Sequence, residues 1–318
     1  MRSHRITFAI AALMLAAIAL SASGCSHETE SRATADASEV EALTKLFTAG
    51  EKAATETPAA ATFQHTGGFQ TISGRIRFDG TPPPRKSMLD SITKDREICA
   101  PGGADVLSPA LIVNGQNNGI KNVILFLKTE KGREVPLHES AKTPSGAVPS
   151  MDNKDCLFVP HITVVNFAVG SIPLKNLDPV DHNMNIQTVV NIGKNSTIPK
   201  NSSSTYEVTA EEPMPAPVSC TIHPWMKGYL HVRGNNYFAV TDENGNFKIE
   251  NLPTGDKLTI QVWHEAGSRG DKGGAINGLT IGGGAATAIK GGFTITLDKD
   301  NPPAELDIAV PPASLPGA

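Results

Sequence analysis

The sequence predicts an all-β protein of the β-sandwich class. Glycine and proline account for 29 and 23 of the 318 residues, whereas aromatic residues make up only 5%. Segments of strand length follow one another between turn-forming residues, and no long segment after residue 60 shows the helical period. The length allows one large domain or two ordinary ones.

The predicted strands are short apolar or alternating segments that stop at Gly, Pro, Asn or Asp. The first, 71–78, ends at an Asp-Gly turn followed by three prolines, and the most apolar one spans 119–129. The other segments that we expect to form strands are 161–169, 171–176, 185–190, 205–208, 229–233, 237–241, 247–249, 258–264, 293–297 and 306–310. Asp242-Glu243-Asn244-Gly245 predicts a tight turn.

The N-terminus has the features of a secretory signal. Arg2 and Arg5 precede an apolar stretch over 6–20, and Ala22-Ser23-Gly24 precede Cys25. This arrangement resembles the bacterial lipobox, in which the cysteine is acylated and becomes the first residue of the mature chain. We therefore expect a signal peptide at 1–24, a lipidated Cys25 with a flexible linker to residue 66, and an exported, membrane-anchored protein at the periplasmic side or the cell surface. The alternative is an ordinary signal peptide cut near the same place.

Charge and motifs exclude several classes of function. The formal net charge is −4, and no basic stripe indicates a nucleic-acid partner. We find no Ser-His-Asp set and no phosphate-binding loop, so the sequence does not predict an enzyme.

The chain contains four cysteines, at 25, 99, 156 and 220. If Cys25 carries lipid, three remain, and three cannot all pair. The unpaired one is then a reactive thiol, part of an intermolecular disulfide or a metal-bound thiolate. Cys220 has the strongest context for a metal ligand.

Cys220-Thr221-Ile222-His223-Pro224-Trp225-Met226 places a thiolate, an imidazole and a thioether on one short loop. This set suits copper, because thiolate and thioether stabilise Cu(I) and imidazole accepts both oxidation states. His182, at the end of Asn176-Leu177-Asp178-Pro179-Val180-Asp181-His182, is the candidate for a second imidazole.

These two motifs resemble the ligand segments of the cupredoxins, the blue copper proteins, and the loop is similar to that of the amicyanin type. The resemblance covers roughly 156–234 and implies a Greek-key sandwich with one type 1 copper bound by His182, Cys220, His223 and Met226. Two positions depart from the pattern: Ile222 stands where amicyanin-like loops have proline, and Trp225 replaces phenylalanine.

The same residues allow other interpretations. A zinc site is one alternative, but a thioether is a poor zinc ligand. A cupredoxin fold without a metal is another, but such a protein would normally have lost one of the four ligands. A binuclear copper centre would need a second cysteine at the position of Ile222.

With Cys220 as a ligand, Cys99 and Cys156 can form a disulfide that stabilises the fold by ~3 to 4 kcal/mol. The rival is a second metal site made by Cys156 and His161. His231 and His264 are expected to be structural or exposed.

The segment from 236 onward resembles carboxypeptidase-regulatory-like, transthyretin-like sandwiches, and the first predicted strand resembles that family's opening strand. We therefore expect a cupredoxin-like domain over 67–235 that is fused to, or inserted in, a smaller prealbumin-like element over 236–312, with a tail at 313–318. The combination resembles cupredoxin-like "methylamine utilization" lipoproteins of bacteria.

The resemblance implies a carrier of single electrons between redox partners that the sequence does not identify. His223 would be the electron port if its edge reaches the surface, with Pro224 and Trp225 beside it. The alternatives are a binding or scaffold sandwich with structural copper or none, and a copper storage or delivery protein.

Overall fold

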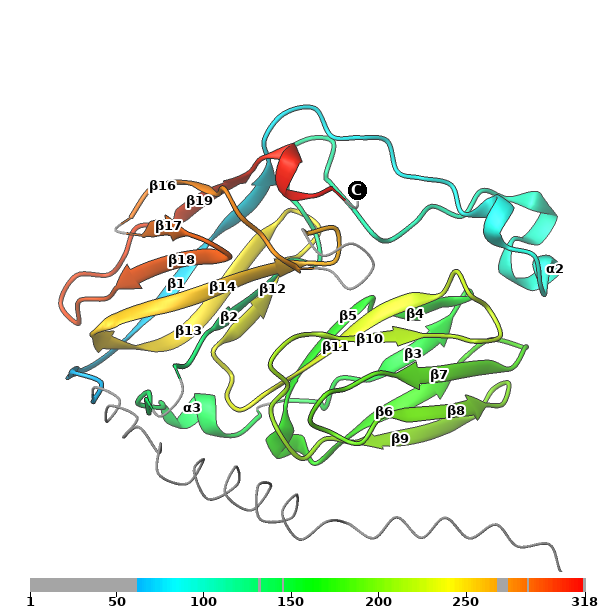
Figure 1. Ribbon diagram of the computed structural model, residues 1–318, viewed down its shortest axis with the longest axis horizontal. Helices are drawn as coiled ribbons and strands as arrows, with labels where there is room; N and C mark the ends of the chain where they lie inside the picture. Colours follow the sequence, from blue (N-terminus) through cyan, green and yellow to red (C-terminus); the bar gives the residue numbers. More distant parts are fainter. Residues whose placement is uncertain (1–61, 131–132, 145, 268–273, 285, 317–318) are drawn as a thin grey trace, which may run out of the picture. The chain divides into compact units, whose positions relative to one another are not determined.

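The computed structural model describes residues 62–130, 133–144, 146–267, 274–284 and 286–316, all within the unit Ala59–Ala318. The predicted signal peptide, Cys25 and almost all of the predicted linker lie outside the described residues. The described chain is built from strands, as expected from the sequence (Figure 1). No helix among these residues is long and apolar enough to cross a membrane.

Two pairs of sheets make up the described chain (Figure 1). We call the first pair the framework sandwich; its sheets have the orders β13-β1-β19-β16 and β12-β2-β14-β18-β17, with β15 beside β14. Its strands are β1 (His65–Phe78), β2 (Ile124–Leu127), β12 (Phe238–Val240), β13 (Asn246–Gly255), β14 (Lys257–His264), β15 (Gly274–Ala275), β16 (Thr280–Gly282), β17 (Thr287–Ile289), β18 (Gly292–Thr296) and β19 (Leu306–Val310).

We call the second pair the insert, because it lies between β2 and β12 in the chain; its sheets have the orders β5-β11-β10-β7-β8 and β4-β3-β6-β9. Its strands are β3 (Met151–Lys154), β4 (Leu157–Val159), β5 (Ile162–Asn166), β6 (Ser171–Asn176), β7 (His182–Ile186), β8 (Lys194–Ile198), β9 (Ser203–Glu207), β10 (Ala216–Ser219) and β11 (Lys227–Arg233). The described helices are one turn long: α2 (Arg96–Cys99), α3 (Glu139–Lys142) and the 3-10 turns Leu89–Ser91, Pro101–Gly103, Phe167–Val169 and Pro312–Ser314.

The sheets divide the chain at different positions from the domain boundaries expected from the sequence. β1 and β2 fall within the expected cupredoxin-like range 67–235, yet β1 pairs with β13 and β19, and β2 pairs with β12 and β14. Strands distant in the sequence pair because their apolar faces share one core, which contains Ile76, Leu125 and Ile260. The framework sandwich therefore includes strands from both ends of the described chain, and the insert interrupts it.

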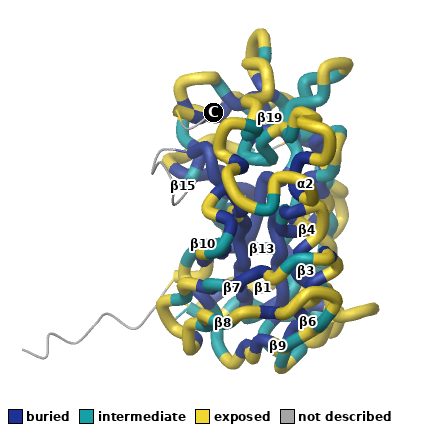
Figure 2. Tube along the Cα trace, turned by 90° about the vertical axis from the view of Figure 1, so that its right-hand side faces the viewer, coloured by how far each residue is buried: buried dark blue, intermediate teal, exposed yellow. Residues whose placement is uncertain are grey.

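Alternation along the strands explains both cores. In β1 the residues from Ile72 to Phe78 alternate between buried and partly exposed positions, and β14 does the same from Leu258 to Val262. Figure 2 shows buried stretches along the strands and exposed turns between them. The insert has its own core, to which both of its sheets contribute, for example Leu174 from β6 and Leu230 from β11.

Buried aromatic and charged side chains join the framework sandwich to the insert. Phe126 of β2 packs edge-on against His231 of β11, with ring centroids 4.6 Å apart. Arg233 lies over the same Phe126 ring at 4.5 Å, donates to the Leu127 carbonyl at 2.8 Å and pairs with Glu211 at 2.6 Å. The buried guanidinium is thus neutralised and hydrogen-bonded, which a buried charge requires.

A segment between β1 and β2 leaves the framework and packs on the insert. We call residues 88–106 the capping loop, because the Met88 N–H donates to the Val106 carbonyl at 2.8 Å and closes its base. Ile92, Cys99 and Ala100 are buried in the insert core. Cys99 forms a disulfide with Cys156, with Cα atoms 5.2 Å apart and a sequence separation of 57 residues. Closing a loop of this length stabilises the fold by about 4 kcal/mol.

His264, at the end of β14, is only 1% exposed and accepts the Ala266 N–H at its Nδ1. Burial lowers the pKa of His264 to about 4, although the Glu265 carboxylate opposes the shift. The ring is therefore neutral in the folded protein at pH 7 and becomes protonated more readily after unfolding. This histidine is structural, as the sequence suggested.

We expect the free energy of unfolding to fall by about 2 kcal/mol between pH 7 and pH 5 because of His264 alone. The unfolded chain binds the proton below its ordinary pKa of 6.5, whereas the folded chain resists protonation down to about 4. Urea unfolding at both pH values measures this difference, and His264→Gln should reduce it by that amount. The exposed His65→Gln is the control; equal pH dependence in wild type and His264→Gln would contradict the prediction.

Candidate metal centre

Two segments of the insert bring three of the predicted ligands together. His182 begins β7, and Cys220 and His223 lie on the loop between β10 and β11. The Nδ1 atoms of His182 and His223 are 2.9 Å apart, and Cys220 Sγ lies 3.8 Å from His223 Nδ1. All three side chains are buried, with His182 and His223 fully so. One ligand atom from each lies within 4.8 Å of the others, a spacing suited to one metal ion.

The loop that carries Cys220 is held closed by its own backbone. The Met226 N–H donates to the His223 carbonyl at 2.9 Å, and the Cys220 N–H donates to the Met226 carbonyl at 3.3 Å. Met226, the predicted axial ligand, is fully buried in the insert core. Because β10 pairs with both β7 and β11, the loop is fixed at the end of the sheet where His182 begins β7.

Asn183 links the two segments. Its backbone N–H donates to Cys220 Sγ at 3.2 Å, and its side-chain oxygen accepts the Thr221 N–H at 3.3 Å. The His223 N–H also donates to Cys220 Sγ, at 3.4 Å. Two backbone donors directed at one sulfur stabilise its thiolate form.

Each imidazole is held from its outer side by a carboxylate that sequence analysis did not assign. His182 Nε2 lies 2.8 Å from Asp178 Oδ2, and His223 Nε2 lies 2.8 Å from Asp95 Oδ2. An ionised carboxylate only accepts hydrogen bonds, so the Nε2–H of each ring donates to its carboxylate. In a neutral ring, Nδ1 then carries the lone pair that faces the site. Asp178 stands four residues before His182 in the quoted motif, but Asp95 has no sequence signal because it comes from the distant capping loop.

Electrostatics place a proton among the ligands when no metal is bound. Burial lowers the pKa of His182, but its bonds to Asp178 and Cys220 outweigh this and raise it to about 9. Burial raises the pKa of the Cys220 thiol, but hydrogen bonds from His182 and from backbone N–H groups outweigh this and lower it. Burial lowers the pKa of His223, with Asp95 opposing and His182 adding to the effect. These shifts favour a charged His182, move Cys220 toward its thiolate form and move His223 toward its neutral form.

This donor set fits a copper ion. Two imidazole lone pairs at 2.9 Å repel one another unless a cation lies between them. A proton on one of the two nitrogens removes part of this repulsion. A metal ion bound by both nitrogens and the thiolate would remove all of it. Two nitrogens and a thiolate suit copper, as does the thioether of Met226, which is buried and belongs to the same loop as Cys220 and His223.

The condition for His223 to be the electron port, that its edge reaches the surface, is not met in this structure. Its side chain is fully buried, and Asp95 of the capping loop covers its Nε2. Trp225 is also buried, with its ring centroid 5.0 Å from that of His223, whereas Pro224 is exposed. A hollow of about 400 Å³ beside Asp95 and Ile222 is lined by Lys94, Asp95, Pro179, Val180, Asp181, Lys200 and Ile222.

The rival second site does not form. The sulfur of Cys156 is consumed in the disulfide with Cys99, so it is not available as a thiolate. His161 instead contacts the Glu265 carboxylate through Nε2. Cys220 is the free cysteine of the described residues.

Comparisons with known proteins give a partial likeness. No family model and no curated protein matches the chain. Among solved structures, an amicyanin variant in its Cu(I) form is 19% identical over 31% of this chain and 97% of its own, with a TM-score of 0.24. A copper-containing nitrite reductase from Thermus scotoductus SA-01 is 18% identical over 31% of this chain and 25% of its own, with a TM-score of 0.25. A purple cupredoxin from Nitrosopumilus maritimus is 22% identical over 24% of this chain and 82% of its own, with a TM-score of 0.21. At such TM-scores the likeness carries no functional weight beside the side-chain geometry.

We expect Asn183→Ala to lower the free energy of unfolding of the metal-free protein by about 1–2 kcal/mol, because the Thr221 N–H and the Asn195 side chain lose their partner. The same change should weaken metal binding, because the side-chain bond from Asn183 to the Thr221 N–H, one of the links between the two ligand segments, is lost. Urea unfolding and metal titration measure the two effects. Asn185→Ala, on the same strand with one 3.4 Å bond to Ser219, is the control and should have a smaller effect. Equal effects of the two variants would contradict this role of Asn183.

Proposed function

We propose that this chain is an exported mononuclear type 1 copper protein that carries single electrons between redox partners and is not itself an enzyme. The observation that supports this most directly is the convergence of His182 Nδ1, His223 Nδ1 and Cys220 Sγ in a buried site with oriented outer nitrogens. Copper bound there would supply a one-electron couple between Cu(I) and Cu(II).

The protein's own residues would keep the rearrangement between these two states small. The imidazoles are fixed by Asp178 and Asp95, and the thiolate receives the backbone N–H groups of Asn183 and His223. Each ligand is thus held by a group outside the set, so a change in metal charge does not require new side-chain positions. Because His182, Cys220 and His223 are buried, water and substrates would have little access to copper bound there.

Electrons would leave near Pro224 rather than through an exposed imidazole edge. Pro224 is exposed and directly follows His223 in the chain. The hollow beside Asp95 and Ile222 lies at the same end of the insert and offers a surface for brief docking. Under this proposal, a lipid at Cys25 would hold the exported protein on a membrane while the folded part meets its partner.

Copper loading should produce an intense thiolate-to-copper absorption band and a reversible one-electron wave, and Cys220→Ser should abolish both. The oxygen that replaces the sulfur cannot supply the charge-transfer transition. Ser219→Ala, at the neighbouring position, is the control and should retain them. A colourless copper-loaded protein would contradict electron transfer, and labile Cu(I) passed to an acceptor without a redox wave would instead indicate copper delivery.

A further inference from the structure

We propose that Asp95 is a positioning residue of the metal centre and that the Cys99–Cys156 disulfide keeps it in place, so that breaking this disulfide loosens the bound metal. This inference rests on the proposed function only in requiring that the site binds a metal. It concerns the capping loop, to which neither the sequence motifs nor the comparisons assign a role.

The two carboxylates that hold the imidazoles come from different parts of the chain. Asp178 is only four residues from His182, whereas Asp95 is 128 residues from His223. Local chain geometry therefore holds the first pair, but the second pair exists only while the capping loop stays packed on the insert.

Asp178 and Asp95 each accept a hydrogen bond from the backbone N–H of one of the two disulfide cysteines. The Asp178 carboxylate accepts the Asp155 N–H at 2.7 Å and the Cys156 N–H at 2.9 Å. On the other side, the Asp95 carbonyl accepts the Cys99 N–H at 2.9 Å in the single turn of α2. A continuous path thus runs from His182 through Asp178 and the disulfide to Asp95 and His223.

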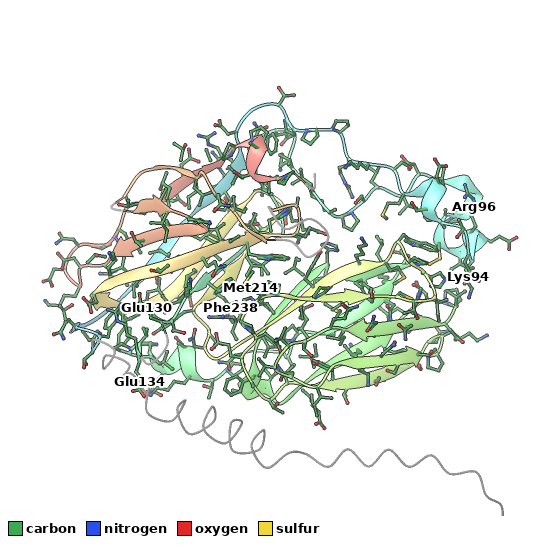
Figure 3. The ribbon with its side chains drawn as sticks, in the orientation of Figure 1. Lys94, Arg96, Glu130, Glu134, Met214 and Phe238 are labelled. Atoms are coloured by element: carbon green, nitrogen blue, oxygen red, sulfur yellow. A yellow bond between two sulfur atoms is a disulfide. The ribbon has the colours of Figure 1, made fainter. Side chains whose placement is uncertain are left out.

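Few other contacts restrain Asp95. Its side chain is 33% exposed, and its backbone is left-handed, with φ 48° and ψ 36°. Arg96 ties the loop to itself by donating to the carbonyls of Leu89 and Ile92 at 3.1 Å. Figure 3 shows Lys94 and Arg96, the neighbours of Asp95, on this loop. The disulfide is the covalent link between the loop and the strands of the insert.

The consequences of losing the link follow from these contacts. A dithiol reductant would donate two electrons and two protons to the disulfide, leaving thiols at Cys99 and Cys156 and a disulfide on the reductant. Among the described residues, the capping loop would then be held on the insert by its apolar contacts and by the bond from Asp95 to His223. Losing a carboxylate behind a metal-binding histidine typically weakens metal binding about 10- to 100-fold.

Asp95→Asn tests the positioning role without disturbing the disulfide or the backbone, because asparagine tolerates the left-handed conformation. We expect Co²⁺ bound to this variant to transfer to a chelator about 10 to 100 times faster than from wild type. The copper reduction potential should rise, because a negative charge that favours Cu(II) has been removed. Asp90→Asn, an exposed carboxylate on the same loop, is the control for the charge change alone.

The double variant Cys99→Ala/Cys156→Ala tests the disulfide, with thermal unfolding measured in parallel. It should also speed Co²⁺ release, and adding Asp95→Asn to it should have a smaller effect than in wild type, since both changes act through one contact. If the double variant fails to fold, Asp95→Asn still decides the positioning role, and Co²⁺ release from the wild type after reduction of the disulfide and removal of the reductant decides the role of the disulfide.

The outcomes separate this inference from the proposed function. Co²⁺ release from Asp95→Asn at the rate seen for Asp90→Asn would overturn the positioning role, and full additivity with the double variant would overturn the role of the disulfide. A missing thiolate-to-copper band in a wild-type protein that retains Co²⁺ would contradict electron transfer while leaving these measurements valid.

Discussion

The site depends on the repulsion between two imidazole lone pairs and a thiolate that face one another in a buried space. The Nδ1 atoms of His182 and His223 are 2.9 Å apart because their outer nitrogens are both committed to carboxylates. Such an arrangement persists only with a positive charge at its centre. In the metal-free protein a proton on His182 provides it, and the hydrogen bonds of that ring to Asp178 and Cys220 raise its pKa to about 9 although burial lowers it. A copper ion would replace the proton and satisfy all three donors together.

The rest of the insert holds these donors at one end of a sheet. Strand β10 lies between β7 and β11, so the start of β7 and the loop after β10 meet at the same edge. The framework sandwich contributes the Phe126 ring and the Leu127 carbonyl, which hold Arg233 of β11. It also contributes the capping loop, which leaves the framework after β1 and covers His223.

Much of this architecture was predictable from local sequence. The strands over 171–176 and 306–310 have the bounds expected from alternation and turn residues. By contrast, the segment expected as a strand over 119–129 forms one only at Ile124–Leu127, because positions 119–123 are used in turns and bridges. The boundary between the sandwiches was not predictable, since pairing of β1 with β19 joins segments more than 200 residues apart.

The same distinction holds at the site. His182, Cys220 and His223 were recognisable because their residue types and spacing carry the chemistry. Asp95 was not, because its role arises only when the capping loop folds onto the insert, and the burial of His223 follows from that same contact. Motifs identify the donors, whereas long-range packing decides how they are oriented and covered.

The most direct measurement is a crystal structure of the copper-loaded protein with anomalous scattering recorded at the copper edge. The account predicts a single strong peak bound by His182 Nδ1, His223 Nδ1 and Cys220 Sγ, with Asp95 and Asp178 still on the outer nitrogens. Copper located elsewhere, or held through the Nε2 atoms, would contradict it.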